Sequence, residues 1–146
     1  PMHAEESALW SLDRKDGMEK AYCCFNSNAR DFARFGQLLL NNGQWDGQQL
    51  ISPAYLAEAT SPDTRLVYKD LGKPNHCYGF QYWILDYKGM KIPYMRGILG
   101  QYVFTLPEKN AVIVRLGHKR SDTYTADQHY PDDINTWLDA AMDLLQ

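Results

Sequence analysis

The 146-residue chain lacks a long apolar run, a surplus of one charge and a dense set of cysteines. Its longest apolar runs are a few residues, whereas a membrane-spanning helix needs about 20. The formal net charge of −3 comes from scattered residues of both signs, unlike the basic surface of a nucleic-acid-binding protein. We therefore expect a soluble protein with no membrane span and no nucleic-acid partner. The compartment, periplasmic or cytoplasmic, stays open.

The three cysteines, Cys23, Cys24 and Cys77, form no Cys-x-x-Cys pair and have no spacing typical of a metal site. A disulfide between Cys77 and one of the two neighbours is one alternative. We favour three small buried thiols, because unpaired cysteine behaves as a small apolar side chain. No cofactor and no metal ion are predicted.

Length and composition predict one globular domain, residues 1–146, with a mostly helical and loop part at 1–76 and antiparallel strands plus a closing helix at 77–146. Hydrophobic residues make up 45% of the chain and aromatic residues 13%. Such a share of rings fits either an aromatic core or a cleft lined by rings. The order of elements predicts an α+β fold with an antiparallel sheet.

Local signals place the elements of the first part. Residues 1–24 show little periodicity and are predicted to be irregular. Asn28 is a suitable N-cap for a helix with one apolar face, and Gly43 ends that helix. The Asp-Gly pair at 46–47 is typical of a tight hairpin turn, and Ser52 with its following proline opens a second, short helix.

Alternating apolar residues predict strands in the second part. A surface loop at 63–76 precedes a strand at 78–84. Residues 96–107 and 110–117 form a hairpin, and an apolar stripe after residue 131 predicts a final helix that lies on the sheet.

Gly97 and Gly100 are predicted to open the first strand of that hairpin. Glycine weakens a strand and often marks the close approach of a ligand or of another backbone, so the two residues indicate the edge of a site. The alternative is a twisted or bulged strand with no ligand.

The motifs of a complete catalytic centre are missing. No serine begins Ser-x-x-Lys, and no Gly-x-Ser-x-Gly, His-Glu-x-x-His or glycine-rich phosphate loop occurs. The four histidines are scattered and each is best explained as a surface or hydrogen-bonded residue. His118 has the best claim to a role as a general base, because it ends a predicted strand beside Lys119 and Arg120.

Several segments, taken together in their order and spacing, carry a family resemblance. They lie at 28–43, 45–47, 51–52, 78–83, 97–101, 107–108 and 112–115. The chain resembles the later half of the penicillin-recognising serine hydrolases, which include class C β-lactamases, D-Ala-D-Ala carboxypeptidases, related esterases and aminohexanoate-oligomer hydrolases. The last branch is most similar, with Gly-Ile-x-Gly-Gln at 97–101. The resemblance implies a C-terminal fragment of the β-lactamase/transpeptidase-like fold.

The resemblance also implies site residues. The family's Ser-x-x-Lys nucleophile and Tyr-x-Asn acid/base group lie upstream of the matched part, and this chain contains neither. The family's Lys-Thr-Gly or His-x-Gly motif corresponds to Met95, Arg96 and Gly97. Met95 departs from the motif, which argues against recognition of a penicillin carboxylate there. The Ile98 N–H matches the oxyanion donor, Gly97 allows close approach, and Arg96 would bind a substrate carboxylate. A solvated strand residue is the alternative for Arg96.

The expected function is the C-terminal portion of a serine hydrolase that cleaves an amide, an ester or a β-lactam, a portion that is inactive alone. Its expected partners are the small substrate, the missing N-terminal portion, and a second copy of the chain that pairs or exchanges a strand at the open edge 111–116. The alternative is a non-catalytic domain that binds a peptide or glycan on an aromatic surface.

Overall fold

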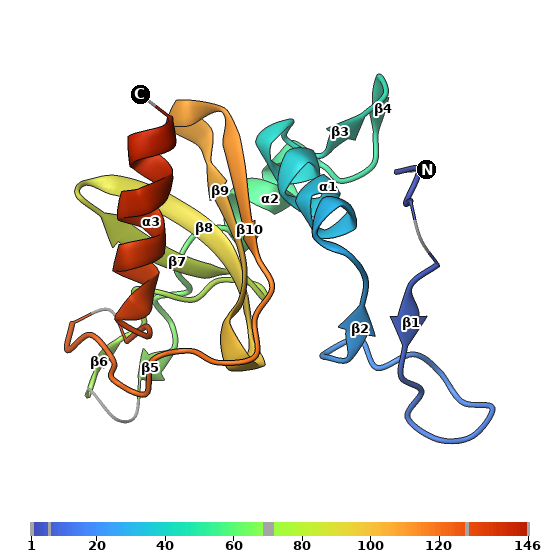
Figure 1. Cartoon of the computed structure of the whole chain (residues 1–146), viewed down its shortest axis with the longest axis horizontal. Helices are drawn as coiled ribbons and strands as arrows, with labels where there is room; N and C mark the ends of the chain where they lie inside the picture. Colours follow the sequence, from blue (N-terminus) through green and yellow to red (C-terminus); the bar gives the residue numbers. More distant parts are fainter. Residues whose placement is uncertain (1, 6, 69–71, 128, 146) are drawn as a thin grey trace.

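The computed structural model describes residues 2–5, 7–68, 72–127 and 129–145. A four-stranded antiparallel sheet lies at its centre, in the order β10-β9-β8-β7. These strands are β7 (Trp83–Tyr87), β8 (Met90–Gly97), β9 (Gln101–Leu106) and β10 (Ala111–Arg115). The helix α3 (Asp133–Leu144) covers one face, and α1 (Ala29–Leu40) covers the other at β9 and β10 (Figure 1). The predicted α+β class with an antiparallel sheet is confirmed.

The main core lies between the sheet and α3. Alternate residues of a strand point to the same face, so Tyr102, Phe104 and Leu106 of β9 all face α3. They pack with Ile134 and Leu138 of the helix, and all of these side chains are fully buried. The apolar stripe predicted after residue 131 therefore does lie on the sheet, although its last members reach solvent.

The opposite face of the sheet is covered by α1 at close range. A Cβ atom on Gly36 would lie 2.5 Å from Cγ1 of Val112 and 3.2 Å from Cγ1 of Val103. Glycine in the middle of a helix costs stability, and here it allows the helix backbone to approach the sheet.

Local chemistry sets the ends of the elements in the first part, as predicted. The Asn28 side chain accepts the Asp31 N–H at 2.9 Å at the start of α1, and Gly43, with φ 81°, follows the helix end. A tight turn at 46–47 joins β3 (Gln44–Trp45) to β4 (Gln48–Gln49). Ser52 caps α2 (Pro53–Ala59) by accepting the Tyr55 N–H at 3.1 Å.

Three stretches differ from the sequence-based prediction. The strand predicted at 78–84 begins only at Trp83. Gln81 adopts φ 65°, which is not a strand conformation. Gly79 lies against the Ala59 carbonyl oxygen, so close that a Cβ atom on Gly79 would be 2.1 Å from it. The loop at 63–76 contains the short ribbon of β5 (Val67–Tyr68) and β6 (Lys73–Pro74). The irregular N-terminal stretch contains β1 (Leu9–Trp10), which pairs with β2 (Phe25–Asn26).

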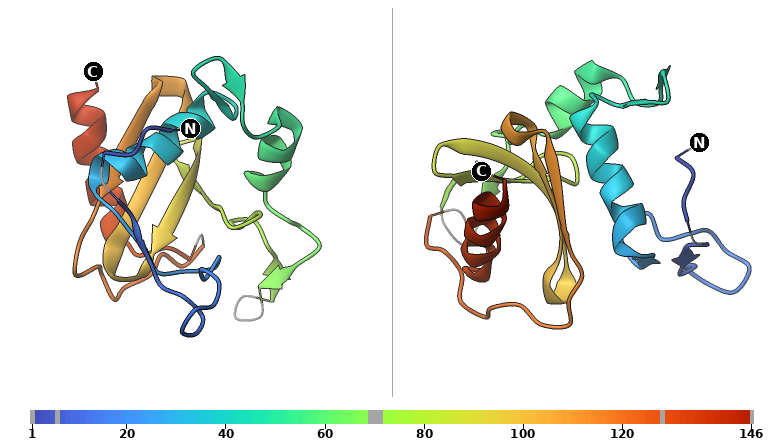
Figure 2. Two further views of the ribbon diagram at one scale, coloured as in Figure 1. Left: turned by 90° about the vertical axis from the view of Figure 1, so that its right-hand side faces the viewer. Right: turned by 45° about the horizontal axis from the view of Figure 1, so that its top comes forward.

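The cysteine prediction is wrong for two of the three residues. Cys23 and Cys24 form a disulfide with each other, whereas Cys77 lies outside that disulfide and is buried as predicted. The alternative of a bond from Cys77 to one of the neighbours is wrong as well. Figure 2 shows that the ribbon of β1 and β2, which carries this disulfide, lies beyond α1 on the side away from α3.

The glycine-rich stretch is a turn between two strands, and the prediction that it opens a strand is wrong. Gly97 ends β8, a single 3-10 turn (η1, Ile98–Gly100) follows, and β9 begins at Gln101. A second turn, η2 (Pro107–Lys109), joins β9 to β10 as predicted. Within the described ranges, every helix is too short or too polar to cross a lipid bilayer.

Candidate functional site

The candidate site is the turn at 97–101 together with the end of β8. Gly97 pairs with Gln101 across the hairpin, and a Cβ on Gly97 would lie 3.0 Å from that of Gln101. Gly97 has an extended backbone with φ −101°, so any residue can adopt its conformation, and the nearby side chain is what favours glycine here. Leu99 and Gly100 have φ of 59° and 83° and turn the chain back into the sheet.

Ile98 is the first residue of this turn, and 77% of it is exposed. The first N–H groups of a helical turn have no acceptor within the turn itself. Ile98 therefore lies at the exposed tip of the hairpin, at the position of a helical turn whose N–H has no acceptor within the turn.

Two long side chains fasten the turn to the segment after β10. Arg115 Nη1 donates to the Gly100 carbonyl oxygen at 2.5 Å, and its Nη2 donates to the Lys119 carbonyl oxygen at 2.7 Å. The side-chain amide of Gln101 bonds to Gly117 twice, donating to its carbonyl oxygen and accepting its N–H at 3.0 Å. These bonds hold both the end of the turn and the start of β9.

Gly100 is required by this arrangement on two grounds. Its φ of 83° lies in the region that side chains rarely adopt. A Cβ at this position would also lie 1.8 Å from Arg115 Nη1, so the guanidinium occupies the space that a side chain would need. Sequence reasoning identified Gly100 but missed Arg115, which has no sequence signal to separate it from a solvated strand residue.

Met95 and Arg96 point to opposite faces of β8, because they are adjacent in a strand. Met95 pairs with Val103 and is half-buried on the α1 side. The Arg96 guanidinium lies on the α3 side, 3.3 Å from the centre of the Trp83 ring. Its Nη1 also donates to the His129 carbonyl oxygen at 3.1 Å. Arg96 is therefore engaged within the chain.

Three arginines gather around the buried ring of Tyr102 near this end of the sheet. Burial raises the pKa of Tyr102 to about 12 and the Asp133 carboxylate adds to the rise, while the positive charges of Arg115, Arg120 and Arg96 act in the opposite direction. The guanidinium of Arg115 also lies 4.8 Å from the centre of the Trp137 ring of α3. Arg115, which holds the turn, thus also contacts Trp137 of α3 and lowers the pKa of the core residue Tyr102 relative to burial alone.

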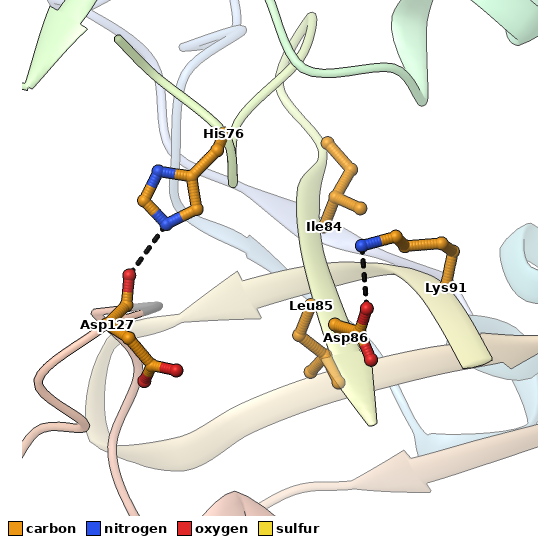
Figure 3. Close-up of a pocket in the computed structure, with 6 residues that line it drawn as sticks. All are labelled: His76, Ile84, Leu85, Asp86, Lys91 and Asp127. Carbon is orange, nitrogen blue, oxygen red and sulfur yellow. Dashed lines mark hydrogen bonds and ion pairs between the residues drawn. The ribbon is translucent and has the colours of Figure 1, made fainter. Parts of the chain in front are cut away.

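None of the hydrogen bonds that hold the turn comes from a histidine side chain. His118 is exposed after β10, and His76 Nε2 lies 2.6 Å from the Asp127 carbonyl oxygen. His76 also lines a shallow cavity of about 290 Å³ with Asp127 and residues of β7 and β8, where Lys91 Nζ lies 2.7 Å from Asp86 Oδ2 (Figure 3). Hydrogen bonds from Lys91 and from the Gly89 N–H lower the pKa of Asp86. The cavity contains none of the residues of the turn.

In the part of the chain that the structure describes, no three histidine, cysteine or acidic side chains come together as a metal site would require. The turn at 97–101 is held in place by side-chain hydrogen bonds and carries the exposed residue Ile98. Stabilisation of a negative charge is the chemistry that such a turn can perform.

Comparisons with known proteins give one line of similarity. No protein-family model matches the chain, and no curated protein matches it. A solved structure from Bacillus anthracis, provisionally named a 6-aminohexanoate-dimer hydrolase, is similar over 99% of this chain with a TM-score of 0.72 and 26% sequence identity. The chain spans about a third of that structure, 34% of its length. The chain therefore has a hydrolase-like fold, and the similarity supports a relationship to β-lactamase-like hydrolases.

Proposed function

We propose that this chain supplies the oxyanion-binding turn and one wall of the cleft of a serine hydrolase, of which it forms the C-terminal portion. The observation that carries the proposal is the turn at 97–101, which hydrogen bonds of Arg115 and Gln101 hold in place and which exposes Ile98 at its tip. The similarity to a structure named as a hydrolase supports it, since the match extends over nearly the whole of this chain.

The proposed chemistry is acyl transfer through a serine ester. When a serine attacks an amide, ester or β-lactam carbonyl, negative charge develops on the carbonyl oxygen. Preorganised N–H donors about 2.7–3.1 Å from that oxygen stabilise the transition state by a few kcal/mol. The Ile98 N–H is the proposed donor, and Gly97, whose missing side chain makes room for Gln101, precedes it at the end of β8.

The proposal depends on Gly97 and Ile98 more than on the two residues before them. Met95, on the α1 side of the sheet, would line the cleft with a neutral side chain. Arg96 would have to leave the Trp83 ring and the His129 carbonyl oxygen to reach a substrate carboxylate, and the loss of these part-buried contacts opposes that movement.

Two surfaces, the exposed apolar N-terminal stretch and the edge strand β10, are candidates for contact with another polypeptide. The N-terminal stretch exposes large apolar side chains, with Leu9 74% and Met18 76% exposed. The strand β10 lies at an edge of the four-stranded sheet. Unpaired edges recruit other chains. We propose that the upstream portion of the parent hydrolase covers these surfaces, and that the isolated chain self-associates through β10.

Sedimentation measurements test the self-association. The average mass of the isolated chain should rise with concentration. A strictly monomeric profile over a wide concentration range contradicts the proposed edge contact.

The proposed function is tested with hydrolysis assays on the isolated chain and on the gene product that includes the segment upstream of Pro1. The isolated chain should not turn over a chromogenic β-lactam, a short-chain ester or an aminohexanoate oligomer. The longer product should contain Ser-x-x-Lys and Tyr-x-Asn and should hydrolyse at least one of these substrates. Hydrolysis by the pure chain that is lost on mutation of one of its own serines contradicts the proposal.

A binding domain for a peptide or glycan is the second candidate. Its support from the sequence was the share of aromatic residues, yet many of these rings, including Tyr94, Tyr102 and Phe104, lie in the core. An upstream frame without the two catalytic motifs would favour it.

A further inference from the structure

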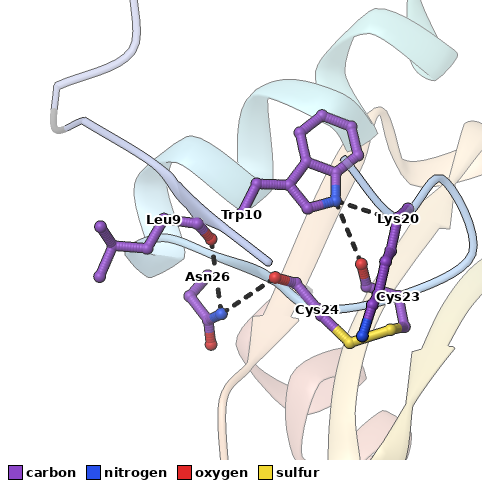
Figure 4. Close-up of a disulfide and its surroundings, with 6 residues drawn as sticks. All are labelled: Leu9, Trp10, Lys20, Cys23, Cys24 and Asn26. Carbon is purple, nitrogen blue, oxygen red and sulfur yellow. Dashed lines mark hydrogen bonds between the residues drawn. A yellow bond between two sulfur atoms is a disulfide. The ribbon is translucent and has the colours of Figure 1, made fainter. Parts of the chain in front are cut away.

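The disulfide between the adjacent residues Cys23 and Cys24 lies directly before β2, in the segment that joins β1 to β2 (Figure 4). We propose that this pair is a redox-active site, which a dithiol reduces reversibly while the protein stays folded. The proposal is independent of the proposed hydrolase function, because it rests only on the surroundings of the two sulfur atoms.

The pair is accessible to a reductant. Cys24 is exposed and Cys23 is half-buried, whereas Cys77 is only 1% exposed. Exposed disulfides exchange more readily than buried ones.

Hydrogen bonds that do not involve sulfur hold the backbone around the pair. Trp10 Nε1 donates to the carbonyl oxygens of Lys20 and Cys23 at 3.0 and 3.1 Å. Asn26 Nδ2 donates to the carbonyl oxygen of Cys24 at 3.2 Å, and Figure 4 shows these bonds on both sides of the disulfide. Reduction leaves all of these groups in place. The two thiols therefore remain adjacent and can form the bond again.

The residue after the pair anchors the ribbon to α1. The Phe25 ring meets those of Phe32 and Phe35 at centroid distances of 5.7 and 5.8 Å. These apolar contacts do not depend on the oxidation state of the cysteines. The fold beyond β2 is thus expected to persist in the reduced protein.

The exchange has two steps. A thiolate of the dithiol attacks the exposed Cys24 Sγ, the bond to Cys23 Sγ breaks, and Cys23 leaves as a thiolate that takes a proton. The second thiol of the reductant then attacks the reductant's first sulfur atom, which is bonded to Cys24 Sγ in the mixed disulfide. Cys24 leaves as a thiolate, which is also protonated. Two electrons pass to the protein, and the dithiol is oxidised to a cyclic disulfide.

The test follows thiol labelling of the whole folded chain. The protein is equilibrated with oxidised glutathione, then titrated with dithiothreitol in native buffer, alkylated with N-ethylmaleimide and mapped by mass spectrometry. We expect no label before reduction and one label on each of Cys23 and Cys24 after it, with Cys77 unlabelled and the circular dichroism spectrum unchanged. Renewed oxidised glutathione should restore the unlabelled state.

Two results overturn the proposal. One is labelling of Cys23 or Cys24 in the oxidised sample, which means that the bond does not form. The other is labelling of the pair only together with Cys77, or only in urea, which means that the disulfide is a buried structural bond.

Phenylarsine oxide gives a second readout, because one trivalent arsenic binds two neighbouring thiols. The reduced chain should bind one equivalent and the oxidised chain none. Cys24→Ser should abolish binding, and Cys77→Ser should leave it unchanged. Binding that survives in Cys24→Ser contradicts the assignment of the site to this pair.

Discussion

The sheet with α3 and the N-terminal stretch 7–26 are stabilised by different means. The sheet buries Ile92, Phe104 and Leu106 completely against the helix. The N-terminal stretch buries no large apolar side chain among its described residues and is held by short backbone contacts, one disulfide and the ring of Phe25. The comparison indicates that the sheet carries its own core, while the N-terminal stretch depends on contacts at its surface.

A pair of identical substitutions tests this comparison most strongly. Leu106→Ala removes a fully buried side chain and should lower the free energy of unfolding by about 2–5 kcal/mol. Leu9→Ala makes the same change at a residue that is 74% exposed and should cost less than about 0.5 kcal/mol. Urea denaturation of both variants gives the two values. Equal losses would mean that the N-terminal stretch has a core of its own.

Alanine substitutions at two turn glycines, Gly100 in the sheet and Gly47 in the β3–β4 hairpin, should differ in their cost to stability. Gly100→Ala should cost about 2–4 kcal/mol, because its φ is positive and its Cβ would meet the Arg115 guanidinium. Gly47→Ala has a similar φ of 77° but open space around it, so only the conformational cost of about 1–2 kcal/mol remains. Thermal unfolding of both variants measures the difference, and a loss at Gly47 as large as that at Gly100 contradicts the fastening role of Arg115.

The buried hydroxyl of Tyr102 gives a smaller effect that depends on pH. The hydroxyl has no hydrogen-bond partner among the described residues, so Tyr102→Phe should raise the free energy of unfolding at pH 7 by about 1 kcal/mol. The folded-state pKa of about 12 lies above the ordinary value of 10.0. The native state therefore keeps its proton in this range, and the stability contributed by the neutral form is lost as the pH rises from about 10 to about 12. The phenylalanine variant should lose less stability across this window in urea titrations, and an unchanged alkaline loss contradicts the role of Tyr102.

The sequence predicted those features of the fold that local chemistry determines. The caps at Asn28 and Ser52 and the hairpin turn at 46–47 depend on side chains within three residues of the backbone groups that they satisfy. The strand predicted at 78–84 was wrong because packing of Gly79 against the Ala59 carbonyl oxygen overrides the alternating pattern. No local signal reports such a contact.

The candidate site was predictable only in part, for a similar reason. The spacing of Gly97 and Gly100 indicated a site edge at this turn. The hydrogen bond that holds the turn comes from Arg115, which is 15 residues away from Gly100 in the chain. Three cysteines in a sequence leave their pairing open. The bond between Cys23 and Cys24 depends on a backbone conformation that the spacing alone does not specify.

Ile98→Pro in the proposed parent hydrolase tests directly whether the Ile98 N–H binds the oxyanion. Proline removes only the N–H at the first position of a helical turn, where its ring is tolerated, and Gly97 before it already has the extended conformation that proline requires (φ −101°, ψ 174°). We expect kcat to fall about 10²–10³-fold with the fold intact, whereas Ile98→Val, which keeps the N–H, should retain nearly full activity. Undiminished turnover by the folded proline variant would contradict the account.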